Sequence, residues 1–178
     1  MGSIQFNPFE DRLSRDIRND LSETIIGTIE NRSLTEAEKI AASYRARNLS
    51  STYTNYIDQR LKRYGVAVET LKADSGLLVQ AAVLWDLGLF FEVHEILEPA
   101  WMEVTGDQKR LLQALIRAAG VYINLELGYR QRAEKIGAKT VPVLKELQEG
   151  LADSINAEAL IAALETLSEE PPQISVHL

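Results

Sequence analysis

The residues best suited to chemistry in this chain are His94 and Glu98, which stand four positions apart in the stretch Phe90 to Trp101. Side chains at i and i+4 of a helix project from one face about 5 to 6 Å apart. An imidazole and a carboxylate at this spacing can share a divalent metal or move a proton. On a wheel of about 100° per residue, both fall inside the apolar arc that Phe90, Phe91 and Trp101 mark. We therefore expect both to be buried, which is costly unless each finds a partner.

The remaining polar residues of this stretch are expected on its other side. Glu92, Glu95 and Pro99 fall on the part of the wheel that should meet solvent. Pro99 lacks a backbone donor, which leaves the carbonyl of Glu95 unpaired in a helix. We expect a bend near Glu95 or an early end to the helix.

A polar stripe on the following helix is placed to complete the site. Gln113, Arg117 and Asn124 interrupt an otherwise apolar run from Gln108 to Leu127. The stripe is either the solvent-exposed side of that helix or a surface that faces His94. On the second interpretation, Arg117 supplies the cation that a buried carboxylate requires. It would then pair with Glu98 or Glu95. The predicted site is the motif His94, Glu98 and Trp101, with Glu95, Gln113, Arg117 and Asn124 around it.

The metal chemistry available to His94 and Glu98 is limited by their number. A zinc site takes three or four protein ligands, and the only other histidine is His177, close to the end of the chain. A di-iron bundle needs Glu-x-x-His motifs, and residue 91 is Phe. No cofactor is therefore certain.

Two alternatives for this site stay open. One is a divalent metal on His94 and Glu98 in a weak, carboxylate-rich site with Glu95 or Glu126. The other is a metal-free hydrogen-bonded cluster, with members His94, Glu98, Arg117 and Gln113.

Composition excludes several function classes. The 178 residues are 46% hydrophobic, contain no cysteine and carry a formal net charge of −7. An acidic chain is poorly suited to neutralising phosphates, so nucleic acid is not an expected partner. The lack of cysteine excludes disulfides and thiolate chemistry. Because we find neither a leader peptide nor an apolar run of membrane-spanning length, we expect a cytoplasmic protein with no membrane partner.

Apolar periodicity predicts helices throughout, and no strand alternation is found. The N-terminal part is expected to form one amphipathic helix with Ile17, Leu21, Ile25 and Ile29 on its apolar face, a second helix to about residue 47, and a third over about 52–72. After the turn at 73–76, helices are expected over 77–87, 90–101, 108–127, 130–148 with a bend or restart at Pro142, and 156–167. The central helix is 108–127, because apolar residues surround it.

The predicted fold is all-α, an antiparallel helical bundle with an N-terminal helical extension. The expected divisions are residues 1–75 for the extension, 76–168 for the bundle that carries the motif, and 169–178 for a mobile tail rich in acidic and proline residues.

The stretch around the motif resembles the domain-of-unknown-function 309 family, whose mark is His-x-x-x-Glu-x-x-Trp. Here those positions are His94, Glu98 and Trp101, preceded by Gly88-Leu89-Phe90-Phe91-Glu92, and residues 112–116 resemble the second motif of the family. The resemblance covers roughly 77–150. Pro99 and Asn124 depart from the pattern, since a helix former and a basic residue or histidine are expected there. The resemblance implies a helical bundle and metal binding by His and Glu, and it implies no known reaction.

The sequence therefore leaves three functional interpretations. The first is a structural or interaction role, in which a polar cluster fixes helix packing or meets a protein partner. The second is binding of a divalent metal or a small ligand. The third is a metal-dependent hydrolase with His94 or Glu98 as general base. A homo-oligomer is compatible with each of them.

Overall fold

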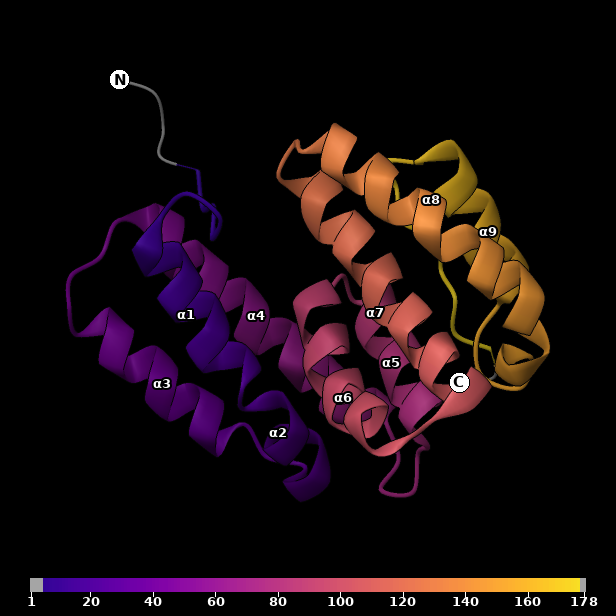
Figure 1. Ribbon diagram of the computed structural model, residues 1–178. Helices are drawn as coiled ribbons and strands as arrows, with labels where there is room; N and C mark the ends of the chain where they lie inside the picture. Colours follow the sequence, from indigo (N-terminus) through magenta and orange to yellow (C-terminus); the bar gives the residue numbers. More distant parts are fainter. Residues whose placement is uncertain (1–4, 177–178) are drawn as a thin grey trace. The chain divides into compact units, whose positions relative to one another are not determined.

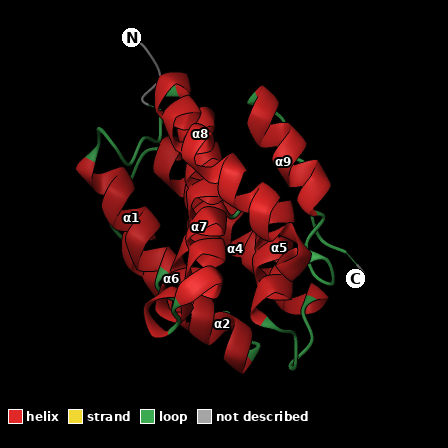
Figure 2. Cartoon of the chain, turned by 45° about the vertical axis from the view of Figure 1, so that its right-hand side comes forward, coloured by secondary structure: helices red, strands yellow, loops and turns green. Residues whose placement is uncertain are grey.

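The computed structural model describes residues 5–176 of the chain and is all-α, as the sequence predicted (Figure 1). Figure 2 shows these residues as helices joined by loops. The chain divides into two compact units, Met1–Ala73 and Asp74–Leu178. Each unit is described separately below.

The N-terminal unit is built from four helices around a small apolar core. They are α1 (Arg12–Ser22), α2 (Ile25–Asn31), α3 (Thr35–Arg45) and α4 (Ser51–Thr70). The helix α1 begins at Asp11, whose carboxylate accepts hydrogen bonds from the backbone N–H groups of Leu13 and Ser14. The core joins three of the helices through Ile17, Leu21, Ala41, Tyr44 and Ile57.

The single helix predicted over Ile17 to Ile29 is two helices, α1 and α2, separated at Glu23 and Thr24. Side chains at the break bond to the preceding backbone, because Ser22 Oγ donates to the Asn19 carbonyl and Thr24 Oγ1 donates to the Leu21 carbonyl. Such local bonds offer the backbone an alternative to helical pairing. The four isoleucine and leucine residues of the predicted stripe are nevertheless all buried.

The C-terminal unit is a chain of helices in which each packs on the next. These are α5 (Leu77–Asp86), α6 (Phe90–Glu103), α7 (Gly106–Glu126), α8 (Arg130–Leu147) and α9 (Ala157–Thr166), with a short 3₁₀ turn over Gln148–Leu151. The loops from α5 to α8 are short, so successive helices run antiparallel (Figure 1). The helix α7 packs against both α6 and α8. This agrees with the prediction that it is the central helix.

Neither proline inside a helix ends it. The helix α6 continues beyond Pro99 to Glu103, and α8 runs through Pro142 without a restart. The expected early end of α6 is therefore wrong. Pro99 is exposed, and it leaves the Glu95 carbonyl without an intrahelical donor.

Residues 171–176 are mainly extended and bond to α5. The indole Nε1 of Trp85 donates to the Pro172 carbonyl at 3.0 Å. The carboxylate of Asp86 accepts hydrogen bonds from the backbone N–H groups of Ile174 and Ser175, at 2.7 and 3.1 Å. Ile174 is buried. These bonds tie Ile174 and Ser175, within the segment expected to be a mobile tail, to α5 through acceptors that composition does not reveal. His177 lies outside the described residues.

Candidate functional site

The helix α6 is fixed in the C-terminal unit by an aromatic cluster. Phe90 lies 5.3 Å from the ring of Tyr122 in α7 and 5.0 Å from Trp85 in α5, measured between ring centroids. Phe90, Val93 and Leu97 recur every three to four residues and are buried. The residues between them, His94 and Glu98, are therefore presented from a firmly packed helix.

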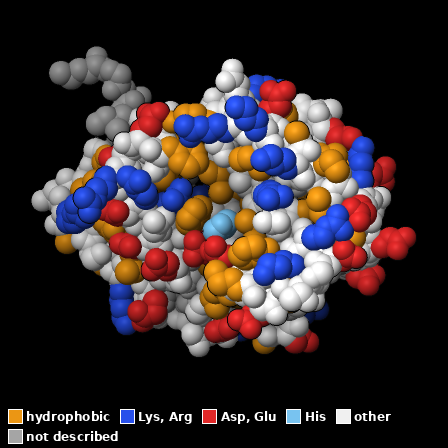
Figure 3. Space-filling model, in the orientation of Figure 1, with side chains coloured by type: hydrophobic (Ala, Val, Ile, Leu, Met, Phe, Trp, Pro, Cys, Tyr) orange, Lys and Arg blue, Asp and Glu red, His pale blue; other side chains and the backbone are white. Residues whose placement is uncertain are grey.

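His94 lies beside two carboxylates of its own helix. Its Nδ1 is 3.8 Å from Glu98 Oε2 and 4.0 Å from Glu95 Oε1. Both separations exceed hydrogen-bond length, so they are ion pairs only when the imidazole is protonated. The ring stacks on Phe91, with 5.8 Å between centroids and 13° between planes. Figure 3 shows a pale blue imidazole at the surface with red acidic side chains next to it.

Three ionisable residues of α6 differ from the prediction in how far they are buried. The side chains of His94 and Glu98 are 33% and 41% exposed, although the wheel placed them in the core. Glu92, predicted to face solvent, is fully buried. A wheel sorts residues by the apolar neighbours on one helix, whereas burial depends on which faces other segments cover. The motif is thus a partly open site and not a sealed core cluster.

Trp101 is half-buried at the other end of the motif. Its Nε1 is buried and has no hydrogen-bond acceptor among the described residues. The Nζ of Lys109, in the first turns of α7, lies 4.7 Å from the centre of the indole ring. This is within the range of a cation–π interaction. Sequence reasoning missed Lys109, because the contact joins two helices and leaves no periodic signal in either.

The polar stripe of α7 does not form the predicted ion pair. Arg117 makes no ion pair or hydrogen bond with Glu98 or Glu95 in the part of the chain that the structure describes. Gln113 is also half-buried. Asn124 is buried, and its Nδ2 donates to the Gly120 carbonyl one turn earlier in the same helix. The remaining motif residues, His94, Glu98 and Trp101, lie on α6 without a cation from this stripe.

The donor set does not fit a resident metal. Among the described residues, no three His, Cys, Asp or Glu side chains lie close enough together to hold a metal ion. His94 and Glu98 supply two donors, and neither Glu95 nor Glu126 completes a set of three. A structural or catalytic zinc site would need at least one more protein ligand.

The same segment is the one that matches a known family. The family model of the domain of unknown function DUF309 matches residues 78–136, from α5 into the first turns of α8. This segment belongs to the DUF309 family. The DUF309 match contains His94, Glu98, Trp101 and the α7 stripe, and it leaves the N-terminal unit outside.

Other comparisons add no relative to the DUF309 match. Neither a curated protein nor a solved structure matches this chain. None of the helices among residues 5–176 has the length and apolar character needed to cross a bilayer.

Proposed function

We propose that this protein is a binding module, and that the α6 cluster, defined as His94, Glu95, Glu98 and Trp101, recognises a cationic group on a small ligand or a protein partner. The observation that carries the proposal is the pair of carboxylates within 4.0 Å of a partly exposed imidazole. The side chain of Glu98 is 41% exposed, so its carboxylate gives the open side of the cluster a negative charge. A guanidinium or ammonium group complements that charge.

A second observation supports a cation as the preferred ligand. The cluster already holds one cation of the chain, because Lys109 lies over the indole face of Trp101. Aromatic faces attract cations through the ring quadrupole. The partly exposed carboxylate of Glu98, on the same helix as Trp101, is a favourable partner for a second positive group.

A purely structural role has weaker support. A polar cluster that specifies packing is expected to satisfy its hydrogen bonds, since each unmade bond is costly. Here the buried Nδ1 of His94 and the buried Nε1 of Trp101 have no hydrogen-bond partner among the described residues. Unsatisfied polar atoms of this kind are not what a cluster selected for packing alone should contain.

Catalysis has weaker support for a similar reason. A general base acts through short hydrogen bonds to a nucleophile or a water, and the distances from His94 to its carboxylates are 3.8 and 4.0 Å. A metal on His94 and Glu98 would need a further ligand from the bound molecule. We therefore prefer recognition of a cationic group to hydrolysis as the function of this cluster.

The proposal is tested by NMR titration of the protein with N-acetyl-arginine amide. The guanidinium of this probe is charged, whereas the isosteric N-acetyl-citrulline amide is neutral. We expect the imidazole signals of His94 and the indole signal of Trp101 to shift with the arginine probe. We expect much smaller shifts with citrulline.

Two variants locate the site. Glu98→Gln removes one carboxylate of the cluster and should abolish most of the shift at His94. Glu103→Gln, an exposed residue on the same helix, should leave it unchanged. Equal shifts with both probes, or none at His94 and Trp101, would contradict the proposal.

A further inference from the structure

A separate pocket of about 640 Å³ opens within the C-terminal unit. Ala100 of α6 and Val104, which follows the end of this helix, contribute to its wall. At about 100° per residue, Ala100 lies roughly 120° around the helix from His94. The pocket therefore belongs to a different face of α6 from the cluster described above.

The wall of this pocket is mainly apolar. Leucines from three further helices line it, including Leu78 of α5, Leu111 and Leu112 of α7, and Leu147 of α8. Its volume is within the range of about 300 to 1,000 Å³ typical of small-molecule sites. An aliphatic chain is the ligand part that such a wall accommodates best, because each buried methylene contributes favourable transfer free energy.

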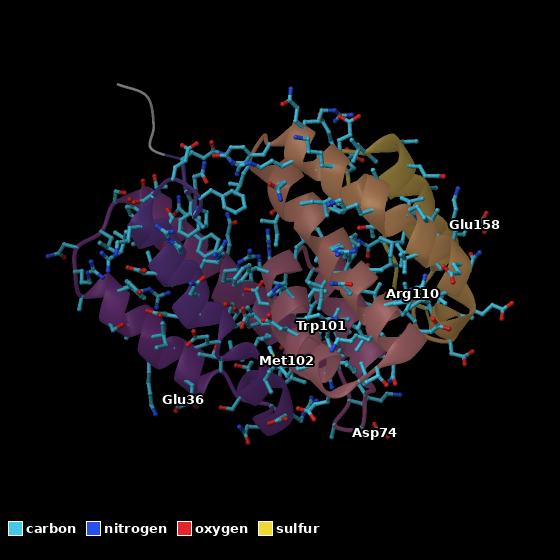
Figure 4. All side chains as sticks on the ribbon, in the orientation of Figure 1. Glu36, Asp74, Trp101, Met102, Arg110 and Glu158 are labelled. Atoms are coloured by element: carbon cyan, nitrogen blue, oxygen red, sulfur yellow. The ribbon has the colours of Figure 1, made fainter. Side chains whose placement is uncertain are left out.

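The rim of the pocket is acidic. Asp107, Glu146 and Glu149 all line it. Arg110, labelled in Figure 4, bonds to both Asp107 and Glu146, with separations of 2.9 Å to Asp107 Oδ1 and 2.5 Å to Glu146 Oε2. Arg110 thus pairs with two of the three carboxylates. The hydrogen bonds from Arg110 lower the pKa of Glu146, so this carboxylate is ionised at neutral pH.

Glu149 is the carboxylate that is left for a ligand. Its side chain makes no ion pair or hydrogen bond with any residue that the structure describes, and it is exposed. It stands in the 3₁₀ turn Gln148–Leu151, immediately after α8. The excess negative charge and the unpaired carboxylate both favour a cationic group at the mouth of an apolar pocket.

We infer that this pocket binds an amphiphilic amine, with the aliphatic chain against the leucine wall and the ammonium against Glu149 and the acidic rim. This site is independent of the α6 cluster and does not rest on the function proposed for it. The ligand class follows from the combination of an apolar wall with an acidic rim. A fatty acid would meet the same wall and a repulsive rim.

Calorimetric titration of the full chain with octylamine, octanol and octanoate, at concentrations below micelle formation, tests the inference. The three probes share one alkyl chain and differ in head-group charge. We expect octylamine to bind roughly fivefold more tightly than octanol, and octanoate more weakly than both. Ala100→Phe, which places an aromatic ring in the pocket, should weaken all three probes.

Two variants at exposed carboxylates test the role of Glu149 without disturbing the core. Glu149→Gln changes an exposed side chain and should reduce octylamine binding to the level of octanol. Glu134→Gln, which lies about 18 Å before Glu146 along α8, should preserve the difference between the probes. The inference is overturned if octanoate binds as tightly as octylamine, if the preference for amine survives Glu149→Gln, or if no probe binds the wild-type protein.

Discussion

At the scale of single residues, His94 and Glu98 are conspicuous in the sequence because they interrupt an apolar helix face. Their identity and spacing were sufficient to predict that they lie side by side. Their exposure was not predictable, since burial depends on packing by other segments. The buried Glu92 shows the same limit in the opposite direction.

Glu98→Gln is expected to have little effect on stability. The carboxylate is 41% exposed and lies 3.8 Å from His94 Nδ1, and partly exposed ion pairs contribute about 1 kcal/mol or less. Chemical denaturation of the wild type and the variant should give free energies of unfolding within that range. A loss above about 3 kcal/mol would indicate a structural buried pair and would argue against an open recognition site.

Tyr122 should titrate well above a free tyrosine. Burial raises the pKa of its phenol to about 12. Because the folded protein holds this proton more tightly than the unfolded chain, the stabilisation is fully present below about pH 10 and is lost as the pH rises toward 12. Absorbance titration near the phenolate band, compared with Tyr122→Phe, measures this group. A Tyr122 signal that titrates near pH 10 would contradict the packing assigned to it.

At the scale of helices, periodicity located almost every element of the chain. It failed at α1 and α2, where the buried stripe continues but Ser22 and Thr24 bond to the preceding carbonyls and end the helix. The early end considered at Pro99 does not occur, since α6 continues to Glu103. The break between α1 and α2 arises from side-chain bonds, which hydrophobic spacing does not encode.

The anchoring of the C-terminal segment to α5 is expected to depend on Asp86. Its carboxylate accepts two backbone hydrogen bonds, from Ile174 and Ser175, and a third from the Ser175 hydroxyl. Hydrogen bonds to a charged group contribute about 1.5 to 3 kcal/mol, so Asp86→Ala should destabilise the unit by about 2 kcal/mol. Hydrogen exchange of the Ile174 and Ser175 amides should rise strongly in this variant.

Asp153→Ala is the matched control, because Asp153 is exposed and no hydrogen bond links it to the described part of the C-terminal segment. It should leave the exchange of both amides unchanged. Unaltered exchange in Asp86→Ala would show that the segment is held by other contacts.

At the scale of the whole molecule, the chain comprises two compact units, and the DUF309 match lies in the second. The two units meet at Ala73 and Asp74, close to residue 75, where the small and polar residues Ala73 to Gly76 led us to expect a division. The sequence did not reveal a role for the N-terminal unit. The sequence of that unit predicts a buried apolar stripe, and we recognised in it no motif of catalytic or metal-ligating residues. The boundaries of the two units as folding domains remain a prediction.

Limited proteolysis is expected to cut first in the turn between the units. Ala73, Asp74 and Gly76 are exposed and outside helices, which is typical of cleavage sites. Mass spectrometry should give two fragments that meet near residue 74. A first cut inside α4 or α5 would contradict the division.

The central claim is that the α6 cluster recognises positive charge. It is tested most directly by the ratio of the dissociation constants of N-acetyl-citrulline amide and N-acetyl-arginine amide, measured for the wild type and for Glu98→Gln at one low ionic strength. The account predicts a ratio of roughly five or more for the wild type, falling toward one in the variant. A ratio near one in the wild type, or a ratio that Glu98→Gln leaves unchanged, would contradict it.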